Sequence, residues 1–310
     1  MRIIFFGTSE FAVPSLEHLL AARQHVVLCV TQPDRSQGRG LRTAHSPLKA
    51  AALRLRVPVV QPERLAGDLF NDVQADAGVV AAYGQLIPRG LLGRLPHGML
   101  GVHPSLLPKY RGAAPIAWAL LNGDPRTGVT IFRLNERMDA GDILSQRVVA
   151  IEPEEHAEAH TQRLAMLGAQ GLVEALDAIA ASGAIFKPQV ESEATIAPKL
   201  TKAQGRIDWR RPAESIARLV RALVPWPGAR TWWQGQDVKI WKASVEASPS
   251  GASSSSGSVV RVDPEGIAVA TGQGLLRLEE VQLAGRRRMG AKEFLAGHRL
   301  HIGDILGGDT

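Results

Sequence analysis

The first hundred residues alternate short apolar runs with segments of helical spacing, and this alternation limits the possible folds more than any other feature. Four apolar runs predict buried strands, at residues 1–7, 25–30, 77–82 and 99–103. Apolar residues recur at helical spacing in Val13–Leu20 and in Ser46–Arg56. Strands that alternate with helices favour a parallel sheet with helices on both faces. We therefore predict an α/β fold with a Rossmann-like parallel sheet.

The sequence changes character toward its C-terminal third. After a break in the pattern around residues 191–206, short strand-like runs follow at 237–241, 258–262, 266–270 and 275–278. Many short strands separated by turn residues are typical of a small barrel of the oligonucleotide-binding (OB) kind. We predict an N-terminal domain over 1–190, a linker over 191–206 and an OB-like β-barrel domain over 207–310.

Polar and turn residues follow each predicted strand of the N-terminal domain, including Thr8, Gln32, Tyr83 and His103. The carboxyl ends of parallel strands meet at one edge of a sheet, which is where ligands bind. Asp139, in the segment Asp139-Ala-Gly-Asp142, offers a carboxylate to His103. An imidazole exchanges protons near neutral pH, so His103 and Asp139 are candidates for an acid–base pair. On spacing alone, a capping or structural histidine is equally consistent.

Several common site types have no signature in the sequence. Gly7-Thr-Ser-Glu-Phe-Ala12 replaces the dinucleotide fingerprint after the first strand, so a nicotinamide cofactor is not expected. No P-loop and no cluster with metal-ligand spacing is found, and we predict no metal. The single cysteine, Cys29, lies in an apolar run and is expected to be buried. No secretory or membrane-spanning segment is recognisable, so we predict a cytoplasmic protein without a membrane partner.

Positive charge is concentrated at two places. From Thr201 onward there are 16 Lys and Arg against 11 Asp and Glu, within a net charge of +6 for the chain. A loop after the second strand carries Arg35, Arg39 and Arg42 among Pro and Gly residues. Basic surfaces of this kind favour a nucleic-acid partner. Ordinary solvated surfaces are the alternative for both places.

Taken together and in this order, the motifs resemble the methionyl-tRNA formyltransferase family over nearly the whole chain. The matching segments are Arg2-Ile-Ile-Phe-Phe-Gly-Thr8, Thr31-Gln-Pro-Asp-Arg35, Gly38-Arg-Gly40, Ala81-Ala-Tyr-Gly84, Ser105-Leu-Leu-Pro108, Arg111-Gly-Ala-Ala-Pro115, Thr127-Gly-Val-Thr130, Met138-Asp-Ala-Gly-Asp142, Ala197-Pro-Lys-Leu200, Ile207-Asp-Trp209, Arg221-Ala-Leu-Val-Pro-Trp-Pro-Gly228 and Lys239-Ile-Trp241.

The resemblance implies transfer of a formyl group from 10-formyltetrahydrofolate to the amino group of initiator methionyl-tRNA. It assigns catalysis to His103 and Asp139, and contact with tRNA to the loop of Arg39. The resemblance also implies that Ser105, Leu106, Leu107 and Pro108 form the turn that contacts folate, and we add Tyr83 and Gly84 to the predicted folate site. We extend the predicted tRNA contacts to Arg35, Arg42, Arg286, Arg287, Arg288 and Lys292. No obligate protein partner is evident, so we expect a monomer.

The chain departs from the family pattern at Gly101, where the family has a catalytic asparagine two residues before the histidine. Loss of one such donor typically lowers the rate by about 10²–10³. We therefore expect either a replacement donor or a slow enzyme, and we predict that Gly101→Asn raises turnover. Two alternatives remain open: a folate-dependent formyltransferase acting on a small amine or amino sugar nucleotide, and a catalytically weak tRNA-binding homologue.

Overall fold

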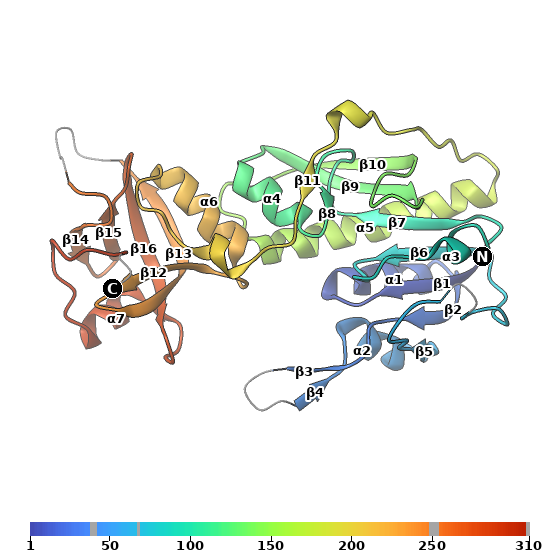
Figure 1. Cartoon of the computed structure of the whole chain (residues 1–310), viewed down its shortest axis with the longest axis horizontal. Helices are drawn as coiled ribbons and strands as arrows, with labels where there is room; N and C mark the ends of the chain where they lie inside the picture. Colours follow the sequence, from blue (N-terminus) through green and yellow to red (C-terminus); the bar gives the residue numbers. More distant parts are fainter. Residues whose placement is uncertain (38–41, 67–68, 248–253, 308–310) are drawn as a thin grey trace. The chain divides into compact units, whose positions relative to one another are not determined.

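The computed structural model describes residues 1–37, 42–66, 69–247 and 254–307, which form two compact units. Unit 1 comprises Met1–Pro115, Pro125–Ile151 and Ala159–Pro198. Unit 2 comprises Ile116–Asp124, Glu152–Glu158 and Lys199–Thr310. Each unit contains its own principal β-sheet (Figure 1). Within the described ranges, no helix combines the length and apolar character that a membrane span requires.

Unit 1 is built on a seven-stranded sheet with the order β10-β9-β7-β6-β1-β2-β5. Its parallel strands are β1 (Arg2–Gly7), β2 (His25–Val30), β5 (Val59–Val60), β6 (Ala77–Ala81) and β7 (Met99–His103). This part confirms the predicted parallel sheet. The prediction missed two antiparallel strands at one side of the sheet, β9 (Arg126–Arg133) and β10 (Ile143–Ala150).

Burial explains why β10 was harder to recognise than the parallel strands. All five residues of β7 are buried, so this strand forms a continuous apolar run. Strand β10 lies at the end of the sheet, and its residues are only partly buried or exposed. Its sequence therefore mixes Ser145, Gln146 and Arg147 with apolar residues. No uninterrupted apolar run marks it as a strand.

Further helices and short elements lie between residues 10 and 205, in both units. The helices are α1 (Val13–Ala21), α2 (Pro47–Arg54), α3 (Arg89–Leu92), α4 (Pro115–Asn122) and α5 (Ala157–Ala180), with 3-10 turns η1 (Glu10–Ala12), η2 (Glu191–Glu193) and η3 (Lys202–Gly205). Two small ladders pair β3 (Arg35–Gln37) with β4 (Arg42–Ala44) and β8 (Arg111–Gly112) with β11 (Ile196–Ala197). Part of the predicted linker is thus ordered by its pairing with β8.

Aromatic and aliphatic side chains pack on one face of the parallel strands. Phe6 makes edge-to-face contacts with Phe70 and Tyr83, at centroid distances of 5.8 and 5.7 Å. Cys29 is fully buried as predicted, and burial raises the pKa of its thiol to about 12. The thiol therefore stays protonated at neutral pH, which makes it a poor nucleophile.

Unit 2 contains the predicted β-rich region as a six-stranded sheet. Five of its strands follow the order β12-β13-β16-β15-β14, and β17 pairs with β16. The strands are β12 (Ala229–Trp233), β13 (Gln236–Glu246), β14 (Val259–Asp263), β15 (Gly266–Ala270), β16 (Leu275–Leu283) and β17 (Met289–Gly290). All their pairings are antiparallel. Helices α6 (Ala213–Leu223) and α7 (Ala291–Gly297) pack against this sheet.

A buried hydrogen bond in unit 2 provides a stability test. The indole nitrogen of Trp209 donates to the hydroxyl of fully buried Thr231 at 2.9 Å. Thr231→Val would leave the indole N–H without its acceptor, and we expect a loss of about 1–3 kcal/mol in the free energy of unfolding. Urea unfolding checks this. The double variant Thr231→Val with Trp209→Phe should lose less free energy of unfolding than the sum of the two single variants. Strictly additive losses would contradict the assigned pairing.

Candidate active site

The ends of three parallel strands are tied together at the carboxyl edge of the sheet, as the sequence predicts. The carbonyl oxygen of Tyr83, just after β6, accepts hydrogen bonds from the Thr8 hydroxyl and from the Gln32 side-chain amide, both at 2.9 Å. Gly84 follows with a φ of 83°, and a Cβ there would lie 2.6 Å from the Gln32 amide nitrogen. Glycine therefore permits this close approach.

The side chain of Tyr83 points away from this edge. It is 1% exposed and belongs to the hydrophobic core. Burial raises the pKa of its hydroxyl to about 12. Of the predicted folate contacts at this strand end, Tyr83 therefore offers its backbone and not its ring.

His103 ends β7 and is 6% exposed. Its Nε2 lies 2.8 Å from the carbonyl oxygen of Tyr110. Because a carbonyl only accepts hydrogen bonds, Nε2 carries the hydrogen of this pair. In a neutral ring, Nδ1 is then the nitrogen that can take up a proton. It faces Asp139 Oδ2 at 3.6 Å, which is longer than a direct hydrogen bond.

Asp139 reaches His103 from the loop between β9 and β10. Its Oδ2 accepts a hydrogen bond from the backbone amide of Gly112 at 2.8 Å, and its φ of 50° lies in the left-handed region. Gly141 follows in the same turn, where a Cβ would lie 1.7 Å from the carbonyl oxygen of Arg133. The glycine of the Asp139–Asp142 motif thus lets the turn approach β9.

Gln189 holds this turn in place, and no motif in the sequence points to this role. Its side-chain amide donates to the carbonyl oxygens of Asp139 and Gly141 at 2.9 and 2.7 Å. Its Oε1 accepts two hydrogen bonds from Arg111, at 3.0 and 2.7 Å. The Arg111 guanidinium also donates to both oxygens of Glu191, and this lowers the pKa of that carboxyl. Arg111 is therefore an internal anchor, although its sequence context also allowed a role at the rim of a ligand site.

The turn Ser105–Pro108 is held by groups on β9 and β10. The Thr130 hydroxyl donates to the Ser105 carbonyl oxygen at 2.7 Å and accepts from the Leu107 amide at 3.1 Å. The Gln146 amide donates to the Leu107 carbonyl oxygen at 2.8 Å. Ser105, Leu107 and Pro108 are buried, and Leu106 is partly exposed. Leu106 is therefore the residue of the predicted folate turn with the most accessible side chain.

No open space exists beside Gly101. Its partner across the sheet is Phe132, and a Cβ built on Gly101 would lie 2.3 Å from Cε1 of that ring. An asparagine at position 101 would therefore have to displace the Phe132 ring, and the expected gain in turnover of Gly101→Asn stays a prediction. Phe132 already occupies the space next to residue 101.

The basic loop after β2 is described only in part. Arg35 and Arg42 belong to the paired strands β3 and β4, whereas Arg39 lies outside the described residues. Asp34 anchors the start of this hairpin: Lys49 binds its Oδ2 at 2.5 Å and Gln61 its Oδ1 at 2.8 Å. These hydrogen bonds lower the pKa of Asp34 to about 2.

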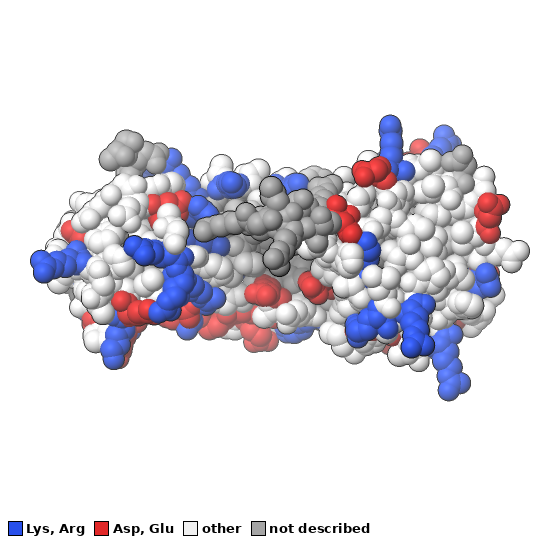
Figure 2. Space-filling model, turned by 90° about the horizontal axis from the view of Figure 1, so that it is seen from below, with Lys and Arg blue, Asp and Glu red and all other residues white. Residues whose placement is uncertain are grey.

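The predicted basic residues of unit 2 are all exposed, but two of the arginines have acidic partners. Arg287 pairs with Glu293, and Arg288 pairs with Glu280. The guanidinium of Arg288 also lies 4.8 Å from the ring centroid of Trp241. On the face in Figure 2, basic and acidic side chains lie interspersed. Local ion pairs thus offset part of the positive charge that the composition shows.

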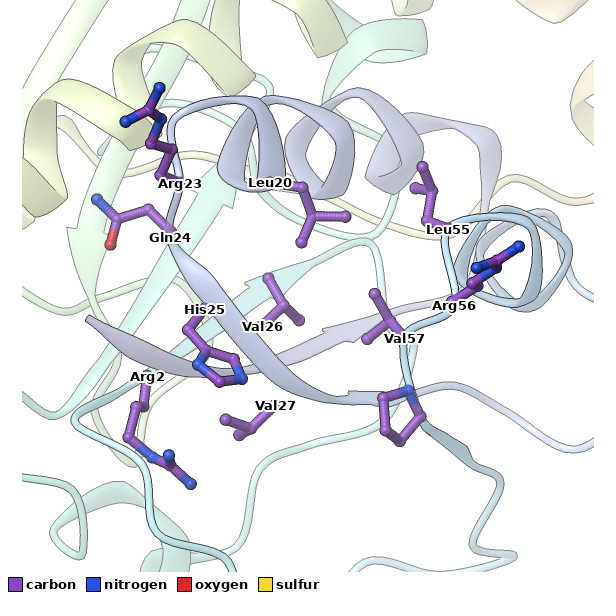
Figure 3. A pocket seen from close by; sticks show the side chains of 11 residues that line it. Arg2, Leu20, Arg23, Gln24, His25, Val26, Val27, Leu55, Arg56 and Val57 are labelled. Atoms are coloured by element: carbon purple, nitrogen blue, oxygen red, sulfur yellow. The ribbon is translucent and has the colours of Figure 1, made fainter.

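A depression in unit 1 lies at the opposite end of the strands from His103. Arg2 and His25, the first residues of β1 and β2, line it together with Val57 (Figure 3). His103 is the last residue of β7, at the carboxyl edge. The depression is therefore not part of the candidate site. In the part of the chain that the structure describes, no three His, Cys, Asp or Glu residues form a group able to hold a metal ion.

Solved structures with this fold include proteins of different function. HypX from Aquifex aeolicus in complex with tetrahydrofolic acid has a TM-score of 0.65 at 19% identity, over 95% of this chain and 47% of that chain. WlaRD, a sugar 3N-formyl transferase, has a TM-score of 0.68 at 18% identity, over 93% of this chain and 99% of that chain. Methionyl-tRNA formyltransferase from Clostridium thermocellum has a TM-score of 0.54 at 14% identity, over 79% of this chain and 94% of that chain. These identities establish a shared fold only.

Sequence comparison is more specific. The family model for formyl transferase matches residues 1–176, and that for the formyl transferase C-terminal domain matches residues 199–299. Methionyl-tRNA formyltransferases from Solibacter usitatus and Roseiflexus castenholzii are 45% and 46% identical, over 99% of this chain and 99% of each relative. The relative from Caldanaerobacter subterraneus is 42% identical over 99% of this chain and its own full length. The chain belongs to the methionyl-tRNA formyltransferase family.

Proposed function

We propose that this protein transfers a formyl group from 10-formyltetrahydrofolate to the α-amino group of initiator methionyl-tRNA in the cytoplasm, for translation initiation. The observation that carries the proposal is the meeting of His103, at the end of β7, with Asp139, in the loop between β9 and β10. The chain also has full-length similarity to enzymes of that name. We assign catalysis to unit 1 and tRNA binding chiefly to unit 2, and we expect the monomer to be active.

The carboxyl edge of unit 1 has features that suit a flat, partly apolar folate. Leu86 follows β6 and Met138 precedes Asp139, and their side chains are 72% and 58% exposed. Exposed apolar side chains next to buried polar groups are typical of small-molecule sites. We propose that these residues, with Leu106 and the backbone of Gly84, contact the folate.

The proposed reaction needs a proton acceptor. Folate supplies the formyl group, and the neutral amine of methionyl-tRNA attacks the formyl carbon. A new C–N bond forms to the amine, and the C–N bond to folate breaks. Nδ1 of His103 takes the amine proton and returns it to the departing folate nitrogen. The Asp139 carboxylate, 3.6 Å away, balances the charge of the imidazolium between these two transfers.

Other substrates of formyltransferases are the competing candidates. Sugar formyltransferases share the fold at less than 20% identity, whereas the full-length relatives with more than 40% identity are methionyl-tRNA formyltransferases. Gly101 and the basic C-terminal third are the features that favour a catalytically weak tRNA-binding homologue. The retained contact between His103 and Asp139 argues against it.

The catalytic pair is tested by single-turnover formylation of methionyl-tRNA. We expect His103→Ala and Asp139→Asn to lower the rate by about 10²–10⁴, the range for loss of general acid–base catalysis. Glu136→Gln is the matched control, because Glu136 lies in the same loop, is exposed and pairs with Arg89 at the surface. Near-native rates in both catalytic-pair variants would contradict the assigned roles.

Gln189 is tested as a positioning residue. Gln189→Glu keeps the acceptor for Arg111 but loses the donors to the two turn carbonyls, so the Asp139 carboxylate should shift. We expect kcat to fall by about tenfold with little change in either KM, since small displacements at an active site are costly. Asp139→Asn should then cost less in this background than in the native protein. Full additivity of the two changes would argue that Gln189 does not act through Asp139.

Contact with the tRNA backbone is tested by the salt dependence of tRNA affinity. Neutralising about two phosphates should weaken binding about tenfold between 50 and 200 mM salt. Arg286→Gln combined with Lys292→Gln should flatten this dependence. A change of less than twofold for the native protein would favour a small amine or sugar substrate over tRNA.

A further inference from the structure

The packing around His103 includes one contact that the proposed mechanism does not use. Gly101 on β7 and Phe132 on β9 are direct neighbours across the antiparallel pair. A Cβ on Gly101 would lie 2.3 and 2.6 Å from Cε1 and Cζ of Phe132, and 2.9 Å from Leu134 Cδ1. Real Cβ contacts are essentially never this short. The observed place of the Phe132 ring therefore requires glycine at position 101.

From this place the Phe132 ring meets the histidine. The ring centroids of His103 and Phe132 are 6.4 Å apart, with an interplanar angle of 86°. Such an edge-to-face arrangement is a favoured geometry for aromatic pairs. Phe132 is 3% exposed, so it is packed firmly and has little access to substrate.

Three groups thus surround the imidazole. The Tyr110 carbonyl oxygen holds Nε2, the Asp139 carboxylate lies opposite Nδ1, and the Phe132 ring packs against the imidazole ring. Because the Nδ1 contact is 3.6 Å long, it restrains rotation of the ring less than a direct hydrogen bond would. The edge-to-face contact with Phe132 is a further contact on the same ring.

We infer that Phe132 is a positioning residue for His103, and that Gly101 serves the reaction by leaving room for the Phe132 ring. The role of Phe132 in turnover rests on the proposed function, whereas its control of the orientation of His103 does not. The pair acts through the geometry of the imidazole and not through contact with either substrate.

The test compares Phe132→Leu with Phe70→Leu in the full-length protein. Phe70 is a suitable control because it is also a buried phenylalanine of unit 1, 4% exposed, in an edge-to-face pair with Phe6. We expect both variants to lose stability, but only Phe132→Leu to lower kcat, by about tenfold, with both KM values within twofold of native. Native kcat in Phe132→Leu, or an equal loss in Phe70→Leu, would overturn the inference.

A second comparison uses Gly101→Ala, which should displace the Phe132 ring and lower kcat by tenfold or more. In Gly101→Ala combined with Phe132→Leu, the two shortest contacts of the added methyl are gone, and the remaining one is to the end of the flexible Leu134 side chain, at 2.9 Å. We therefore expect kcat to be no lower than in Phe132→Leu alone. If the loss of kcat in the double variant equals the product of the two single-variant losses, the two residues are not coupled and this part of the inference is overturned. If Gly101→Ala does not fold, Phe132→Leu and Phe70→Leu still decide whether Phe132 positions His103.

An independent readout separates this inference from the proposed function. The ¹⁵N resonances of the His103 ring should shift or broaden in Phe132→Leu and remain native in Phe70→Leu, because only the first variant frees the imidazole to rotate. Identical native-like spectra would overturn the inference whatever the activity. Absence of formylation by the native protein, with the expected spectra, would overturn the proposed function alone.

Discussion

The geometry of the candidate site depends on how one turn, residues 139–142, is held against β9. The turn starts at a left-handed residue, Asp139, and passes the Arg133 carbonyl oxygen at a distance that only glycine allows at position 141. Backbone and amide hydrogen bonds from Gly112 and Gln189 fix it. The carboxylate therefore keeps its place through the fixed backbone of the turn and through the hydrogen bond that it accepts from the Gly112 amide.

The site is assembled from two kinds of strand pairing. The parallel part of the sheet contributes His103 and the tied strand ends at Thr8, Gln32 and Tyr83. The antiparallel part contributes Thr130, which supports the turn after His103, and the loop that carries Asp139. Neither part alone would bring an imidazole and a carboxylate together.

The sequence predicted the parallel strands and the place of His103, because continuous apolar runs and strand-end residues are local signals. It pointed to Asp139 through the motif Asp139-Ala-Gly-Asp142 and the family resemblance. It did not predict the role of Gln189, whose neighbours resemble an ordinary linker. Nor could it place the Phe132 ring, since this depends on the register in which β9 pairs with β7. Strand register and the direction of side-chain hydrogen bonds are tertiary properties. They determine the place of the Phe132 ring and the role of Gln189, which local sequence patterns do not show.

The complementary shapes at positions 101 and 132 also restrict how this protein can evolve. A larger residue at 101 collides with the ring across the sheet, and a smaller residue at 132 leaves a void beside the histidine. Descendants that change one position will then be under selection to change the other. Comparison of close relatives should reveal covariation between the two sites, and an ancestral exchange would have passed through a short-lived, less fit intermediate.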